Sequence, residues 1–299
     1  MSAVLDLPKT TEFSLESARK LVKTALDEET LIILENVSWE NYEQLMADRE
    51  ANGRRSPRFD YSSGTLWIDP KSKPLEGVNF EAVIRAVEIS LDENSTIVLH
   101  HVNWETYEKI LDERNGASNP RFFYHKGKLT IMPTSLEHEA IIFFLELLIN
   151  LVTIEWQVNC AGFRSATFRR EDIKNGFEPD SCFYFGENET KMLGKKRFDG
   201  AQDPPPDLII EVDITSPSLD RFETFREFGV PEIWRFDGEK MQILKLENSE
   251  YVSVGNSLAL PFVTPEKLTE LIYDSEKIRR LEWIGKVQTW AREVKTENE

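Results

Sequence analysis

An internal repeat in the first half of the chain constrains its fold more than any other feature. Residues 26–49 read LDEETLIILENVSWENYEQLMADR, and residues 91–114 read LDENSTIVLHHVNWETYEKILDER, so that Trp39 corresponds to Trp104. Each copy predicts a helix, a short strand and a second helix that carries a Trp and a Tyr three residues apart. Such a Trp/Tyr pair is more typical of core packing than of a ligand site.

The repeat continues into a predicted β-hairpin. Residues 56–68 match residues 119–131 at a shift two residues shorter than that of the preceding segment. A repeat usually indicates a stacked architecture, but two copies are too few for a solenoid. We therefore interpret residues 1–85 as a partial repeat, which makes the first part of the chain a duplicated α+β segment.

Composition and charge restrict the class of protein. The chain has 36 basic and 53 acidic residues, for a net charge of -17, so contact with nucleic acid has to be local. The two cysteines, Cys160 and Cys182, lack metal-site spacing, which indicates a reduced, cytoplasmic setting. The most apolar run, residues 140–154, is shorter than the roughly 20 residues that span a bilayer, so no membrane association is expected.

The second half predicts a mixed α/β sheet flanked by helices. A helix is expected over residues 136–155, with Thr134 or Ser135 as its N-cap. Strands are expected at 181–185, at 207–214 and at 232–236. Between the last two strands, Ser216 and Pro217 predict a helix start and Gly229 predicts its end. A final amphipathic helix is expected over residues 276–291.

Three carboxylates stand at informative places in these strands. Asp180 follows a proline at a bend that opens one strand, and Glu211 and Asp213 share one face of the next strand. Carboxylates that converge from neighbouring strands are suitable ligands for Mg²⁺, which could activate water and neutralise a phosphodiester. An ordinary strand with one solvated face would have the same pattern.

The string PDLIIEVDITSPS, followed by a helix and GVPEIWRFDG, resembles the Uma-type restriction endonucleases of the PD-(D/E)XK nuclease-like superfamily. The resemblance covers roughly residues 100–260. It implies a restriction-endonuclease-like fold with Asp180 and Glu211 as metal ligands for Mg²⁺ or Mn²⁺. A side chain among Glu137, His138 and Glu139 completes such a site, and we assign Glu139 as the third metal ligand.

The chain departs from the superfamily at the catalytic lysine. The usual lysine position, two residues after Glu211, holds Asp213. In the Uma-type family the lysine often comes from the following helix, eight residues before the glycine of GVPE, and that position is Arg221 here. Arginine keeps the positive charge but cannot deprotonate. Arg221 could equally be a solvated residue of the first helical turn.

Basic residues flank the predicted bend and strand. Between residues 160 and 200 there are eight Lys or Arg and seven Asp or Glu. These basic residues could steer a phosphate backbone toward the carboxylates, or they could belong to solvated loops. The seven of them that precede the bend or follow the strand are Arg164, Arg169, Arg170, Lys174, Lys195, Lys196 and Arg197.

Two functions of different classes follow. The first is a metal-dependent endonuclease that hydrolyses phosphodiesters, DNA in particular, with Asp180, Glu211, Asp213 and Arg221 as catalytic residues. The alternative is a degenerate, catalytically inactive nuclease fold that serves as a binding or assembly module. We assign residues 86–275 to the nuclease-like domain and 276–299 to a C-terminal helix, and the hairpin edges offer a surface for a homodimer.

Overall fold

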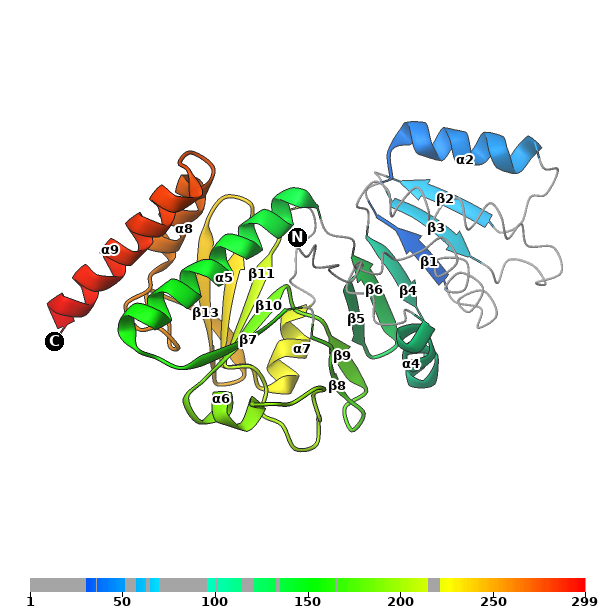
Figure 1. The fold of residues 1–299 in the computed structure, drawn as a ribbon. Coiled ribbons are helices and arrows are strands. Elements are labelled where there is room, and N and C mark those ends of the chain that lie inside the picture. The colour runs from blue at the N-terminus through cyan, green and yellow to red at the C-terminus, as the bar shows by residue number, and fades with distance from the viewer. Residues whose placement is uncertain are drawn as a thin grey trace, which may run out of the picture. The chain divides into compact units, whose positions relative to one another are not determined.

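The computed structural model divides into two compact units, one that ends at Thr134 and one that begins at Ser135 (Figure 1). The structure describes residues 31–35, 37–51, 58–62, 65–69, 96–100, 102–113, 121–132, 135–164, 166–214 and 221–298. The first helix predicted for each repeat copy lies outside these residues, as do Ser216 and Pro217.

Each repeat copy in the first unit contains a strand, a helix and a hairpin. The first copy has β1 (Leu31–Leu34), α2 (Trp39–Ala51), β2 (Arg58–Ser62) and β3 (Thr65–Asp69). The second has β4 (Ile97–His100), α4 (Trp104–Glu113), β5 (Arg121–His125) and β6 (Lys128–Met132). The strands follow the order β2-β3-β1-β4-β6-β5, so the two copies join through the antiparallel β1–β4 pair.

The aromatic residues of the two copies have nearly the same geometry. Tyr42 stacks on Tyr61 with ring centroids 4.6 Å apart, and Tyr107 stacks on Tyr124 at the same separation. In each copy the hairpin tyrosine donates a 2.9 Å hydrogen bond to the carbonyl of a valine that precedes the helix. The repeated aromatics therefore fasten each hairpin to its own helix, which is a packing role.

The second unit contains a six-stranded sheet with the order β14-β13-β12-β11-β10-β7. Its strands are β7 (Cys160–Arg164), β10 (Ser181–Phe185), β11 (Leu208–Val212), β12 (Glu232–Phe236), β13 (Met241–Glu247) and β14 (Glu250–Val254). The β11–β12 pair is parallel and the other pairs are antiparallel. The prediction of a mixed sheet flanked by helices is confirmed.

Three helices pack on one face of this sheet, where α5 crosses the strands (Figure 1). They are α5 (Leu136–Trp156), α8 (Pro265–Ser275) and α9 (Arg280–Asn298). Alternation along β11 sends Leu208, Ile210 and Val212 into this core. The odd-numbered residues of β11 face the other side of the sheet, where the site residues lie.

The remaining elements of this unit are short. They are the hairpin β8 (Phe168–Arg170) and β9 (Asn175–Phe177), and the helices α6 (Gly186–Met192) and α7 (Arg221–Phe228). Helix α7 connects the parallel strands β11 and β12, and Phe225 and Phe228 at its end pack edge-on against Phe177. The crossover helix thus begins with Arg221, close to the end of β11.

Several boundaries follow the signals in the sequence. Ser135 caps α5, since its hydroxyl accepts a hydrogen bond from the His138 backbone N–H at 3.2 Å. Gly229 follows α7 with a φ of 76°, the left-handed conformation that glycine adopts readily. The helix predicted over 276–291 is α9, which begins at Arg280.

Candidate active site

Two buried carboxylates lie side by side at the ends of neighbouring strands. β10 and β11 pair with Ser181 opposite Ile210, so Asp180, one residue before β10, is level with Glu211. Asp180 is 2% exposed and Glu211 is fully buried. All five residues of β11 are buried, so the interpretation of β11 as a strand with one solvated face is wrong.

Asp180 is held by contacts with the backbone of β11 and with a histidine side chain. Its Oδ2 accepts a 2.7 Å hydrogen bond from the backbone N–H of Val212 and lies 3.0 Å from Nε2 of His138. The first contact ties the carboxylate to β11. The second brings in the first turn of α5, whose start is set by the Ser135 cap.

Arg221 contacts two carboxylates, Glu211 within β11 and Asp213 directly after the C-terminal end of that strand. Its Nη1 donates to Oε2 of Glu211, and its Nη2 donates to Oδ1 of Asp213 at 2.8 Å. Burial alone would lower the pKa of this guanidinium, but the charges of Glu211, Asp213 and Asp180 outweigh that effect and raise its pKa. Arg221 is therefore a charged, buried counter-ion, and its interpretation as a solvated residue of the first turn is wrong.

Sequence reasoning missed Arg235, the second cation of this cluster. Arg235 lies opposite Glu211 in the parallel β11–β12 register. Its Nε donates to Oδ2 of Asp213 at 2.6 Å, and its Nη1 donates to Oε1 of Gln242 at 3.1 Å. In the strand EIWRF, alternation directs the Arg235 side chain to the face opposite that of the apolar Trp234 and Phe236. That signal could have indicated on which face of the sheet Arg235 lies.

A family profile with the description putative restriction endonuclease matches residues 104–272, which is more than half of the chain. This range includes His138, Asp180, Glu211, Arg221 and Arg235. The chain belongs to the Uma2 family. No curated protein matches the sequence.

The GVPEIW string, on which the resemblance to the Uma2 family depends most, has a structural role here. Gly229 ends the crossover helix, and Glu232 begins the next strand as a fully buried carboxylate. Glu232 accepts hydrogen bonds from the backbone N–H groups of Leu258 (2.7 Å) and Ala259 (2.8 Å) and from the Trp234 indole (2.6 Å). The motif therefore joins β12 to the segment that leads into α8.

Glu139, the residue assigned as third metal ligand, directly follows His138, whose side chain contacts Asp180. Its Oε2 is 2.5 Å from Nη2 of Arg164, and its side chain is partly exposed. The neighbouring His138 is the member of this turn that contacts Asp180. A ligand role for Glu139 stays a prediction.

Ion pairs within the same region occupy several of the basic residues. Arg164 pairs with Glu139, Arg170 pairs with Asp172 at 2.5 Å, and Lys195 pairs with Asp203 at 2.7 Å. Lys174 lies 3.5 Å from Glu171. These pairs reduce the net field of this region, so phosphate steering receives less support than the sequence alone suggests.

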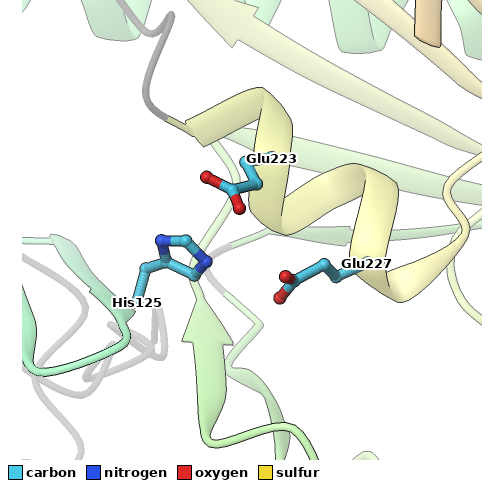
Figure 2. Close-up of side chains that lie close together, drawn as sticks. All are labelled: His125, Glu223 and Glu227. Atoms are coloured by element: carbon cyan, nitrogen blue, oxygen red, sulfur yellow. The ribbon is translucent and has the colours of Figure 1, made fainter. Parts of the chain in front are cut away.

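Two further carboxylates, Glu223 and Glu227, lie on successive turns of α7 (Figure 2). Glu227 accepts a 2.8 Å hydrogen bond from Nδ2 of Asn175, whose Oδ1 accepts one from the Thr224 hydroxyl at 3.1 Å. Glu223 is exposed and lies 3.9 Å from Arg226. Glu227 thus anchors α7 to β9, which helps to fix the helix that carries Arg221.

The donor set is suitable for a divalent cation. Asp180 and Glu211 offer hard carboxylate oxygens from adjacent strands, and such oxygens are the preferred ligands of Mg²⁺. A carboxylate has two oxygens with about four acceptor directions, so the ion pair of Glu211 with Arg221 is compatible with coordination by the same group. Asp213 differs, because each of its oxygens accepts a hydrogen bond from an arginine.

Proposed function

We propose that this Uma2-family chain is a metal-dependent endonuclease that hydrolyses phosphodiester bonds, with DNA as its substrate. The observation that carries the proposal is the burial of Asp180 and Glu211 side by side, with the charge of Arg221 beside them. Two buried acidic groups on adjacent strands are costly unless cations balance them. The membership of the Uma2 family supports the nuclease assignment.

Asp180 and Glu211 would hold Mg²⁺ or Mn²⁺. The ion, when bound, supplies water of lowered pKa and neutralises phosphate charge. The Val212 N–H and His138 hold the Asp180 carboxylate in place. Arg221 has five N–H donors, of which two contact Glu211 and Asp213, and it would donate others to the oxygens of the scissile phosphate. Asp213 would act by orienting Arg221.

A second function is favoured by the state of Arg221. This arginine replaces the usual lysine and is already bound to two carboxylates. The chain would then be a catalytically inactive nuclease fold that binds or assembles with a partner. The net charge of -17 is also more compatible with this alternative than with extensive DNA contact.

We also propose that the first part of the chain is a duplicated segment. The matching stacks of Tyr42 on Tyr61 and of Tyr107 on Tyr124 support it. The division into residues 1–85, 86–275 and 276–299 stays a prediction, as does homodimer formation. Among the described residues, none of the helices combines the length and apolar character needed to cross a membrane. A cytoplasmic location remains a proposal from the free Cys160 and Cys182.

Cleavage assays separate the two functions. The parent chain is incubated with supercoiled and single-stranded DNA and with Mn²⁺ or Mg²⁺, beside Asp180→Asn and Glu211→Gln. Glu187→Gln, on the exposed side of α6, serves as the matched control. Cutting by the parent and the control, but by neither site variant, supports the endonuclease. If the parent does not cut and calorimetry detects no Asp180-dependent Mn²⁺ binding, the endonuclease proposal fails and the binding module remains.

A further inference from the structure

Arg235 lies in the sheet at a position where a charged residue requires a reason. Its neighbours Trp234 and Phe236 are buried, and its own side chain is only 14% exposed. Moving a guanidinium out of water is costly unless it finds charged and polar partners. Asp213 and Gln242 are such partners of Arg235, so its placement is specific.

These contacts form one continuous chain of hydrogen bonds. Gln242 accepts from Arg235, which donates to one oxygen of Asp213 at 2.6 Å. The other oxygen of Asp213 accepts from Arg221 at 2.8 Å, and Arg221 also donates to Glu211. The Asp213 backbone is held as well, because its N–H donates to the carbonyl of Phe236 at 2.7 Å. The chain thus runs from β13 to the proposed metal ligand.

Arg235 and Arg221 both contact Asp213, each through a different carboxylate oxygen. Arg221 contacts Asp213 through Nη2 and directs Nη1 to Glu211. Removal of Arg235 would take away one of the two arginines that contact Asp213. Arg221 would then turn toward Asp213 in the two-point geometry that arginine prefers with a carboxylate.

We infer that Arg235 is a positioning residue that acts on Arg221 through Asp213, an inference that rests on the proposed endonuclease function for its catalytic consequence. The sequence places Asp213 where the superfamily has its lysine. Asp213, held by Arg235, therefore orients Arg221 of the following helix. Lysine could not replace Arg235 fully, because one ammonium cannot reproduce the fork that reaches both Asp213 and Gln242.

Kinetics test the catalytic part. Arg235→Gln should lower kcat for DNA cleavage by about 10- to 100-fold, because a small misplacement of a catalytic group has effects of this size. KM for DNA and calorimetric Mn²⁺ affinity should stay within about threefold of the parent. Arg235→Lys should recover part of kcat. Arg226→Gln is the control: Arg226 is a half-buried α7 residue that pairs with Glu250, and its kcat should be unchanged.

A double variant separates positioning from general destabilisation. If Arg235 acts through Asp213, the variant Asp213→Asn with Arg235→Gln should have the same kcat as Asp213→Asn alone. A structural role would make the two losses multiply. Multiplying losses, or a fall in KM and kcat together, would overturn the inference while leaving the endonuclease proposal intact.

A spectroscopic measurement needs neither metal nor substrate. In protein labelled with ¹⁵N-arginine, the Nε–H signal of Arg221 is assigned by its loss in Arg221→Lys. Arg235→Gln should shift or broaden this signal, and Arg226→Gln should not. An unchanged Arg221 signal in Arg235→Gln overturns the inference whatever the activity. A shifted signal in a parent chain that cuts no DNA would retain the positioning of Arg221 and reject the endonuclease.

Discussion

Removal of the Arg221 guanidinium should destabilise the second unit strongly. In Arg221→Met the side chain keeps much of its length but loses its charge, so Glu211 is left fully buried without that cation. Breaking a buried ion pair from one side costs about 3–5 kcal/mol. Asp213 retains Arg235, so we expect the lower end of this range, about 3 kcal/mol.

Equilibrium urea unfolding measures this loss. The free energy of unfolding is compared at equal denaturant slope, because a changed slope would indicate a changed unfolding reaction. Arg226→Met lies on the same helix, where the half-buried Arg226 pairs with the exposed Glu250, and it should stay within about 1 kcal/mol of the parent.

Mn²⁺ should replace part of the missing charge. A ligand at 100 times its Kd stabilises the folded state by about 2.7 kcal/mol, which is close to the expected loss in Arg221→Met. The unfolding midpoint of this variant should therefore rise with Mn²⁺. A loss below about 1 kcal/mol at unchanged slope, with no response to Mn²⁺, would refute the view that Arg221 compensates a buried carboxylate.

Three further predictions concern the framework. Glu232→Gln places an amide against N–H donors and should cost about 2–3 kcal/mol in urea unfolding, whereas the exposed Glu239→Gln should change little. Burial raises the pKa of the Cys182 thiol above its value in the unfolded chain. The contribution of this thiol to the free energy of unfolding is therefore fully present below the unfolded pKa of about 8.5, and it is lost as the pH rises above that value. The difference between the urea midpoints at about pH 7.5 and about pH 10 should therefore be smaller in Cys182→Ala than in the parent. Tyr124→Phe removes a 2.9 Å hydrogen bond and should cost about 1 kcal/mol, and Tyr61→Phe should cost less because Tyr61 is more exposed; equal losses would contradict this reasoning.

Local signals in the sequence predicted much of the second unit. The strands at 181–185 and 232–236 coincide with β10 and β12, because alternation and flanking turn residues define them. Helix α6 was missed, since its residues are polar and lack an apolar stripe. Helix α8 was missed although Thr264 caps it and Pro265 begins it, two signals that would have indicated its start.

The candidate site was less accessible to sequence reasoning. Asp180 and Glu211 could be placed on neighbouring strands because each strand was recognisable. The partnership of Arg235 with Asp213 could not, because it depends on the parallel register of two strands that a helix separates in sequence. The burial of Arg221 follows likewise from packing of α7 against the sheet, which composition does not specify.

The crossover β11–α7–β12 has a consequence for how such a site is inherited. Glu211, Asp213, Arg221 and Arg235 all come from this single stretch of chain, whereas Asp180 comes from the bend that precedes β10. Recombination with breakpoints outside residues 207–242 would transmit the arginine-carboxylate chain as a block. In shuffled libraries of related genes, chimeras should therefore remain stable when this block has one parent, and should fail when a breakpoint separates Asp213 from Arg235.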